Sequence, residues 1–288
     1  MSPIVWLASY PKSGNTWLRT VLANFQANAE TATDINNLGN GISSDRRAAD
    51  DALGVECSDL TAEELDLYRP AVYRSLAKRS DQPLFIKIHD AYTLNSRAEP
   101  LVPADVTAAA VYLVRNPLDV AVSFARHSNK SLDESIDRMS RETMSLADHP
   151  DRLNFQLPQR LLSWSQHVMS WLDQRAIRLR IMRYEDMHAR PFEEFTETFR
   201  FLGIEGGDVT RVRRAVMFSA FDALRQQEME RGFKEKPGSA ISFFRSGRVG
   251  EWRDILTKDQ VERVIQDHGT VMRRLGYLPE ADAFSSDQ

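Results

Sequence analysis

The stretch Tyr10-Pro11-Lys12-Ser13-Gly14-Asn15-Thr16-Trp17 separates a short apolar run, Ile4 to Ala8, from a helical pattern that begins at about Thr16. The apolar run predicts a buried strand. Behind the loop, four apolar side chains recur at the spacing of one helix face: Leu18, Val21, Leu22 and Phe25. We therefore expect the chain to open with a strand, a loop and a helix.

In such a unit, the backbone N–H groups of the loop and of the first helical turn converge on one point and favour an anion there. A phosphate-like group is the natural ligand. Lys12 adds a positive charge, Gly14 allows the backbone to approach closely, and Thr16 offers a hydroxyl as a cap or a ligand. The alternative is an ordinary turn before a capped helix, because the nucleoside-triphosphate spacing G-x-x-x-x-G-K-[ST] is absent.

Length and composition are those of an ordinary soluble globular protein. The 288 residues are 42% hydrophobic and 27% charged, enough for one domain, or two small ones, with a substantial core. A net charge of −4 argues against a general polyanion binder, so we expect no nucleic-acid partner, although a local basic cleft is compatible with it.

The N-terminus and the cysteine count favour a cytoplasmic protein. Cys57 is the only cysteine, so an intrachain disulfide is impossible and a reducing compartment is expected. The N-terminus lacks a basic region, and its apolar run stops at Ser9. We therefore expect neither a signal peptide nor a membrane span.

Two further strands are predicted to end in ionisable residues. The run 84–89 ends in His89, and Lys87 lies two positions earlier, on the same side of an extended strand. The run Ala109 to Val114 leads directly into Arg115. Ligands of parallel sheets bind beyond the carboxyl ends of strands, so both ends are candidate sites, although a structural histidine and a structural arginine are the alternatives.

The residues after Arg115 predict a helix N-terminus. Asn116 is a good N-cap and Pro117 a good first helical residue, and Ser123 follows about two turns later as a further donor. A second anion site is the simplest interpretation. A nucleotide kinase would be expected to carry an acidic magnesium ligand at such a strand end, and this strand ends in arginine instead.

The remaining chain shows a repeated strand-helix rhythm that predicts an α/β fold with a parallel sheet flanked by helices. A helix is expected over 61–79, with a capping box at Thr61 and Glu64, and its basic residues are interpreted as a solvated face: Arg69, Arg74, Lys78 and Arg79. A long amphipathic helix is expected from Leu161, with core tryptophans Trp164 and Trp171, and a fourth strand from Ile177 that ends at Tyr184. Residues 28–59 are expected to form a long loop or an irregular insert over the mouth of the first loop. Residues 128–155 show no clear period, and 225–250 form either a basic lid or a solvated connector.

Several separated segments together resemble the sulfotransferases that use 3′-phosphoadenosine 5′-phosphosulfate (PAPS). The loop 10–17 resembles their 5′-phosphosulfate loop, and 115–123 resembles their 3′-phosphate segment. Further matches follow in the expected order: Lys87-Ile88-His89, Ser163-Trp164 with Gln166-His167-Val168 and Trp171, Tyr184-Glu185-Asp186-Met187, Arg245-Ser246-Gly247 and Gly250-Glu251-Trp252. The resemblance spans nearly the whole chain and implies one sulfotransferase domain over 1–288, with a three-layer, P-loop-like fold.

The resemblance also implies roles for individual residues. The phosphosulfate would be held by Lys12, Ser13, Gly14, Asn15 and Thr16. Trp17 would stack on the adenine, in a pocket lined by Tyr184 and Phe221. The 3′-phosphate would be bound by Arg115, Ser123, Arg245 and Gly247. Ser246 lies in the same binding segment but replaces the usual lysine, so we expect one fewer cofactor contact.

The resemblance implies a reaction in which His89 is the general base. In-line sulfuryl transfer needs a nucleophile freed of its proton and neutralisation of oxygen charge, much as phosphoryl transfer does. We hypothesise that His89 takes the proton of an acceptor hydroxyl or amine, that Lys12 supports the leaving phosphate, and that Lys87 steadies the sulfuryl oxygens. PAPS would be the co-substrate and 3′-phosphoadenosine 5′-phosphate (PAP) the product, with no metal required.

The acceptor and the oligomeric state are less determined. The segments 28–80 and 128–160 are expected to wall the acceptor side, with 225–250 as a lid. The near-neutral charge favours a small-molecule acceptor, and a resemblance to bacterial sulfotransferases that modify glycopeptide antibiotics suggests a natural-product alcohol or phenol. A homodimer stays open, because Thr257 is followed by Lys258 where cytosolic members pair threonine with valine in their dimer pattern. A P-loop-like kinase and a non-catalytic nucleotide-binding protein are the alternative functions.

Overall fold

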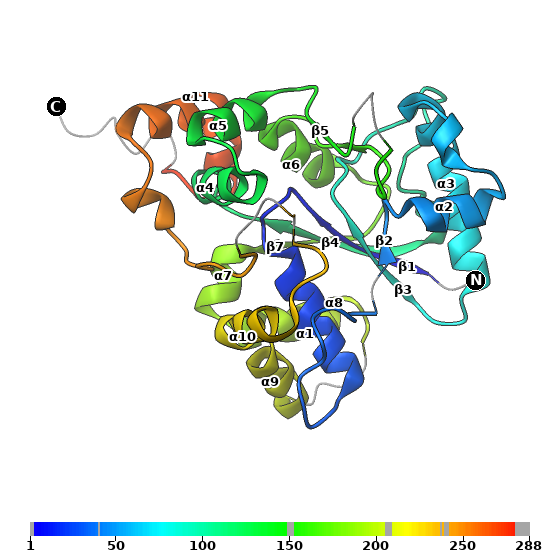
Figure 1. The fold of residues 1–288 in the computed structure, drawn as a ribbon, viewed down its shortest axis with the longest axis horizontal. Helices are drawn as coiled ribbons and strands as arrows, with labels where there is room; N and C mark the ends of the chain where they lie inside the picture. The colour runs from blue at the N-terminus through cyan, green and yellow to red at the C-terminus, as the bar shows by residue number, and fades with distance from the viewer. Residues whose placement is uncertain are drawn as a thin grey trace.

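The computed structural model describes residues 3–39, 41–148, 153–204, 209–236, 238 and 242–279. In this part of the chain, a five-stranded parallel sheet with the order β2-β3-β1-β4-β7 lies between two layers of helices (Figure 1). Its strands are β1 (Ile4–Ser9), β2 (Gly41–Ile42), β3 (Leu84–Ile88), β4 (Thr107–Val114) and β7 (Leu179–Arg183). The short strands β5 (Ser145–Leu146) and β6 (Gln159–Arg160) form a separate antiparallel pair.

Each face of the sheet is covered by its own helices. One layer contains α1 (Asn15–Ala27), α8 (Pro191–Phe201) and α9 (Val209–Phe218), and the opposite layer contains α3 (Ala62–Arg79), α4 (Pro117–Ser128), α6 (Trp164–Asp173) and α11 (Lys258–Arg274). The other helices are α2 (Arg46–Leu53), α5 (Leu132–Ser140), α7 (Tyr184–Ala189) and α10 (Phe221–Arg231). Short 3₁₀ turns cover Cys57–Asp59, Ala104–Val106 and Glu251–Asp254.

The central strand β1 shows why a hydrophobic core lies on each face of the sheet. Its side chains alternate between the faces of the sheet. Ile4, Trp6 and Ala8 join the core under α3, α4, α6 and α11, whereas Val5 and Leu7 join the core under α1, α8 and α9. A strand that is buried on both faces has a continuous apolar sequence, which is what the N-terminal run shows.

The predicted three-layer α/β fold with a central parallel sheet is therefore confirmed. The capping box of Thr61 and Glu64 begins α3 as expected. Trp164 and Trp171 are both fully buried core residues, also as expected. Among the described residues, none of the helices combines the length and the apolar character that a bilayer crossing requires.

The structure corrects three expectations about local structure. Of the two alternatives for residues 28–59, the long loop was wrong, because Asp45 caps helix α2 and β2 adds an edge strand to the sheet. The region 128–155 contains α5, whose capping box joins Ser131 and Glu134. The long amphipathic helix begins at Trp164 rather than Leu161, because Ser163 is its N-cap. The predictions for the inserts and the lid include residues 40, 149–152, 237 and 239–241, which lie outside the described residues.

The interpretation of Arg69 as part of a solvated face was also wrong. Lys78 and Arg79 are exposed, but Arg69 is 2% exposed. Its guanidinium binds both carboxylate oxygens of Asp90, at 2.7 and 2.6 Å. A helix face that looks uniformly basic in sequence is thus divided in the fold between solvent and a buried ion pair.

Candidate active site

Four parallel strands end at nearly the same level of the sheet, and a predicted site residue or loop follows each end. The register pairs Ala8 of β1 with Ile88 of β3, and Val114 of β4 with Arg183 of β7. The residues that follow the four strands are Tyr10, His89, Arg115 and Tyr184. In the sheet, β1 lies between β3 and β4, so the strand order reverses at β1. Ligands of open parallel sheets usually bind in the crevice at the carboxyl ends of the strands at such a point.

The loop after β1 has an unusual backbone. Lys12 has φ 69° and Gly14 has φ 99°, the left-handed region that glycine tolerates best. A Cβ at Gly14 would lie 2.7 Å from Cδ2 of Tyr184, so only glycine fits against that ring. Gly14 is itself the N-cap of α1, without a side-chain cap, so the role of Thr16 as a cap was wrong.

Arg115 fixes this loop to the end of β4. Its guanidinium donates to the carbonyl oxygen of Lys12 at 3.3 Å and to that of Arg248 at 2.9 Å. It also lies 4.3 Å from the centroid of the Tyr184 ring. Lys12 and Arg115, which are far apart in sequence, therefore border one site.

Tyr184 joins the loop to the C-terminal segment. Its hydroxyl donates to the carbonyl oxygen of Gly247 at 2.8 Å. A Cβ at Gly247, which has φ 62°, would lie 2.6 Å from the ring of Phe221. Trp17 lies beside this group, with ring centroids 6.1 Å from Tyr184 and 4.9 Å from His188. Trp17 and Tyr184 thus form one aromatic cluster with His188, and Phe221 lies against Gly247, whose carbonyl oxygen Tyr184 binds.

The segment after Gly247 is held by Asp119 on α4. The buried Asp119 carboxylate accepts hydrogen bonds from the backbone N–H groups of Gly250, at 2.7 Å, and Trp252, at 3.1 Å. Arg245 is exposed and forms an ion pair with Glu251. Ser246 accepts from the N–H of Arg248 at 3.4 Å. Ser123 is partly buried on α4, one turn before His127.

Basic side chains gather at the mouth of the loop. Burial, together with the charges of Arg115 and Lys87, lowers the pKa of Lys12 to about 7. Burial also lowers the pKa of Lys87, against the opposing charge of Glu235. The Lys12 ammonium lies 3.3 Å from Nδ1 of His127 and 4.2 Å from the ring centroid of Phe243. The positive charges repel one another, which favours an anion at this position.

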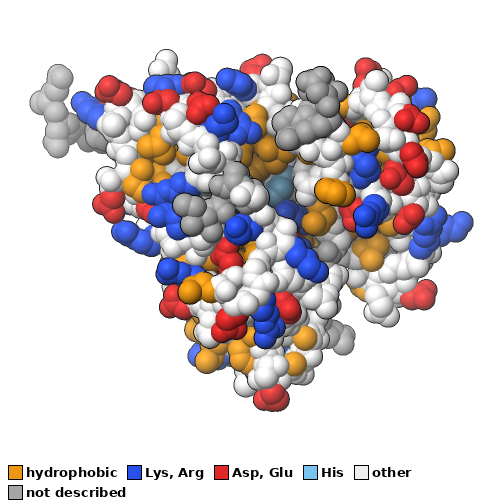
Figure 2. All heavy atoms as spheres, in the orientation of Figure 1, with side chains coloured by type: hydrophobic (Ala, Val, Ile, Leu, Met, Phe, Trp, Pro, Cys, Tyr) orange, Lys and Arg blue, Asp and Glu red, His pale blue; other side chains and the backbone are white. Residues whose placement is uncertain are grey.

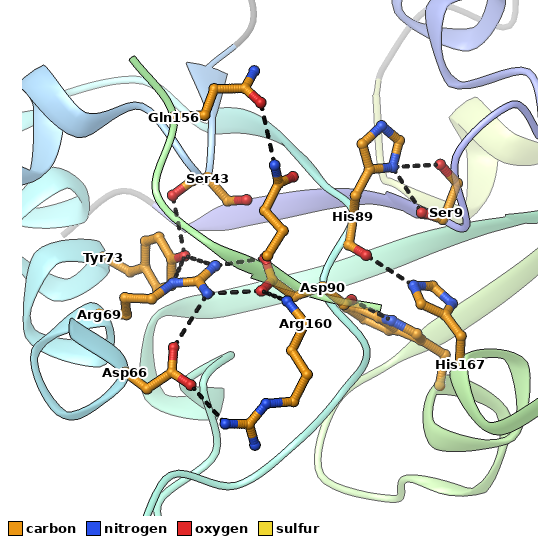
Figure 3. A network of polar contacts seen from close by, with 12 residues as sticks. Ser9, Ser43, Asp66, Arg69, Tyr73, His89, Asp90, Gln156, Arg160 and His167 are labelled. Atoms are coloured by element: carbon orange, nitrogen blue, oxygen red, sulfur yellow. Dashed lines mark hydrogen bonds and ion pairs between the residues drawn. The ribbon is translucent and has the colours of Figure 1, made fainter. Parts of the chain in front are cut away.

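His89 is oriented by the end of β1 (Figure 3). Its Nδ1 lies 2.8 Å from the carbonyl oxygen of Ser9 and 3.2 Å from the hydroxyl oxygen of Ser9. A carbonyl oxygen can only accept, so Nδ1 carries the proton and the neutral ring has its lone pair on Nε2. Burial and the charge of Lys87 hold the pKa of His89 well below its ordinary value. The imidazole is therefore neutral near pH 7, with Nε2 available as a proton acceptor.

A polar network behind His89 fixes its backbone. The carbonyl oxygen of His89 accepts from Nε2 of His167 at 2.9 Å. The carbonyl oxygen of Asp90 accepts from the indole of Trp171 at 3.0 Å, and its carboxylate binds Arg69 and the N–H of Arg160 (Figure 3). The network joins α3, α6 and β6 to the end of β3.

Figure 2 shows a hollow on one face of the molecule, with histidine atoms at its floor and basic atoms beside them. Hydrophobic atoms border the hollow on the side of α4 to α6. Among the described residues, no three His, Cys, Asp or Glu side chains are grouped as metal ligands would be.

Sequence reasoning did not identify several residues at this site: Arg19, Asp90, Asp119, His127, His188 and Glu235. Asp90 directly follows the predicted histidine, and His127 lies four residues after Ser123 on the same helix face, so both had a positional signal. Glu235 lies in a polar segment without periodicity and had none.

Comparison with known proteins agrees with this geometry. A family model described as "Sulfotransferase domain" matches residues 2–276. Sulfotransferase 1A1 of Canis lupus familiaris is 25% identical over 283 residues, covering 94% of this chain and 83% of that protein. Sulfotransferase 4A1 of Homo sapiens is 24% identical over 263 residues, covering 90% of this chain and 76% of that protein.

Solved structures show the same fold. Mouse sulfotransferase SULT7A1 complexed with PAP has a TM-score of 0.60 at 21% identity, covering 96% of this chain and 85% of that chain. Retinol dehydratase in a complex with retinol and PAP has a TM-score of 0.63 at 17% identity, covering 95% of this chain and 82% of that chain. The relationship to bacterial enzymes stays a prediction. With its fold and a family match over nearly its full length, this chain belongs to the sulfotransferase family and is a sulfotransferase enzyme.

Proposed function

We propose that this protein transfers the sulfuryl group of PAPS to a hydroxyl or amine of a small-molecule acceptor, with His89 as the general base. The observation that carries the proposal is the cluster of Lys12, Lys87 and Arg115 around a loop at a helix N-terminus. The charges of Arg115 and Lys87 both lower the affinity of Lys12 for a proton, which favours a ligand with several negative charges. PAPS is such a ligand.

The residues at the site fit the nucleotide. The buried donor groups that lack a hydrogen-bond partner among the described residues include the Ser13 hydroxyl, the Trp17 indole N–H and Nε of Arg115. Gly14 and Gly247 leave no room for a side chain, so that the rings of Tyr184 and Phe221 close onto the backbone. We assign the 5′-phosphosulfate to the loop residues 12–16. We assign the 3′-phosphate to Arg115, Ser123 and the segment 245–247. The adenine would lie beside Trp17, Tyr184 and Phe221.

His89 supplies the proton-transfer step. When bound, PAPS supplies an electrophilic sulfuryl group. Nε2 of His89 would accept the proton of the acceptor hydroxyl as the hydroxyl oxygen bonds to sulfur and the bond from sulfur to the 5′-phosphate oxygen breaks, which releases PAP. Nδ1 would keep its proton and go on donating it to the carbonyl oxygen of Ser9. The lowered pKa ensures that the ring is neutral before the reaction.

The two lysines neutralise charge on the reacting groups. Lys87 lies on the strand that leads to His89, and its charge acts directly on that imidazole. We assign Lys87 to the sulfuryl oxygens and Lys12 to the leaving phosphate oxygen, since Lys12 belongs to the loop that holds the 5′ end.

The acceptor side is formed by the two inserts. The segments 28–80 and 128–160 meet through backbone hydrogen bonds from Leu157 to Ser44, at 2.7 Å, and from Arg46 to Phe155, at 3.2 Å. Asp90, next to His89, binds Arg69 from one insert and Arg160 from the other. Structures of the similar retinol dehydratase contain retinol or androsterone with PAP. We infer a phenol, an alcohol or another small natural product as the acceptor.

Transfer of label tests the proposal directly. The protein should pass labelled sulfuryl from PAPS to at least one member of a panel of phenols, steroids, sugars and peptides, and should show no transfer from ATP with magnesium. Calorimetry should show binding of PAP. Phosphoryl transfer from ATP would support a kinase, and PAP binding without transfer to any acceptor would support a non-catalytic nucleotide-binding protein.

Arg115→Ala should weaken PAP binding by about ten- to a hundredfold, the usual cost of losing charge-assisted hydrogen bonds. Adenosine 5′-phosphate lacks the 3′-phosphate, so its affinity should change far less. Calorimetry with both nucleotides measures the difference, and Arg97→Ala, an exposed arginine outside the site, is the control. If Arg115→Ala weakens the binding of both nucleotides equally, Arg115 does not bind the 3′-phosphate.

PAP binding at about pH 8 should take up protons. With a pKa of about 7, Lys12 is roughly nine-tenths neutral at that pH in the free protein, and nearby phosphates would raise its pKa. Calorimetry in buffers with different ionisation enthalpies measures this uptake. Lys12→Met should lose most of the uptake, and an unchanged value would exclude contact between the Lys12 ammonium and the phosphates.

A further inference from the structure

Glu235 is a carboxylate that the segment 225–250, the proposed lid, places inside the site. One oxygen lies 2.6 Å from the guanidinium of Arg19 on α1, and the other lies 3.0 Å from the Lys87 ammonium on β3. The exposed fractions of the three side chains are 4% for Arg19, 13% for Lys87 and 23% for Glu235. A carboxylate held by two buried cations is a defined contact, unlike an exposed surface pair.

The two cations belong to the elements that build the reaction site. Arg19 lies on the helix that follows the phosphate loop, and Lys87 lies two residues before His89. Glu235 is therefore a direct link between the lid, the phosphate-loop helix and the catalytic strand. The same lid carries Phe243, whose ring lies against the Lys12 ammonium.

We propose that Glu235 is a positioning residue for Lys87, holding its ammonium in place and charged at the reacting end of the site while Arg19 holds the carboxylate. The inference rests on the proposed function of the site. It adds a lid residue that acts through Lys87 rather than on the sulfuryl group itself.

The charges around Lys87 explain why such a residue is needed. Burial disfavours the ammonium, and Arg19 acts in the same direction. The carboxylate of Glu235 opposes both effects, and it also acts on His89. Without it, Lys87 would lose its proton at a lower pH and its charge would be absent when charge develops on the sulfuryl oxygens.

The test compares the full-length wild type with Glu235→Gln and Glu235→Asp. The first readout is the pH dependence of acylation of Lys87 by an amine-selective reagent, followed by mass spectrometry. In Glu235→Gln, Lys87 should become reactive at a lower pH, whereas Lys258, which is 87% exposed, serves as the internal reference. Glu230→Gln on α10 makes the same chemical change at an exposed position and should leave the Lys87 curve unchanged.

The second readout is turnover with PAPS. Glu235→Gln should lower turnover about tenfold and move the alkaline limb of its pH profile to lower pH, with PAP affinity within about threefold of the wild type. Glu235→Asp, which keeps the charge, should restore part of the loss. If the pH dependence of Lys87 acylation is the same in the wild type and in Glu235→Gln, the inference is overturned, whether or not the protein is active. Absence of turnover in the wild type would instead count against the proposed function.

Discussion

Replacing His89 with alanine should lower turnover by at least about two orders of magnitude while leaving PAP affinity nearly unchanged. General-base catalysis typically contributes 10²- to 10⁴-fold, roughly the effect expected when Nε2 is lost. The predicted phosphate loop connects β1 and α1, so we expect PAP binding not to depend on the imidazole. Steady-state kinetics and calorimetry with PAP measure the two quantities separately.

The pH profile adds a second constraint on His89. A histidine with a lowered pKa is protonated only below its ordinary value of 6.5, so wild-type activity should persist through that pH and fall only in more acidic solution. His268→Gln, a buried histidine on α11 outside the site, is the control. Near-normal turnover of His89→Ala would remove His89 from the base role.

Replacing Arg69 with methionine should destabilise the protein by about 3–5 kcal/mol, because it leaves the buried Asp90 carboxylate without its cation. Both side chains are almost completely buried, at 2% and 0% exposure. Tyr73 also accepts hydrogen bonds from the Arg69 guanidinium, at 3.1 and 2.9 Å. Urea unfolding followed by tryptophan fluorescence measures the loss.

An exposed pair of similar chemistry provides the matched control for Arg69→Met. Lys130 and Glu134 form an ion pair with exposed fractions of 48% and 51%, so Lys130→Met should cost less than about 1 kcal/mol. The double variant Arg69→Met with Asp90→Asn should be more stable than the sum of the single changes predicts, since it buries no unpaired charge. A cost for Arg69→Met as small as that for Lys130→Met would contradict the structural role of the pair.

Sequence reasoning was most reliable where a local pattern has a local cause. The apolar run of β1, the capping box of α3 and the N-cap at Asn116 follow from contacts within a few residues, and the structure confirms all three. It was less reliable for α5, although the Ser131 to Glu134 capping box carried the same kind of signal. The polar composition around it concealed that helix.

The amino-acid sequence by itself determined the strand-loop-helix unit, the parallel α/β architecture and the strand ends that carry His89 and Arg115. Only the tertiary structure decided which charges meet: Arg69 with Asp90, and Glu235 with Lys87 and Arg19. The physical reason is that helix and strand patterns depend on neighbouring residues, whereas an ion pair and a lowered pKa depend on burial and on partners far away in the chain. Those partners come together only after the strands have paired and both helix layers have packed against the sheet.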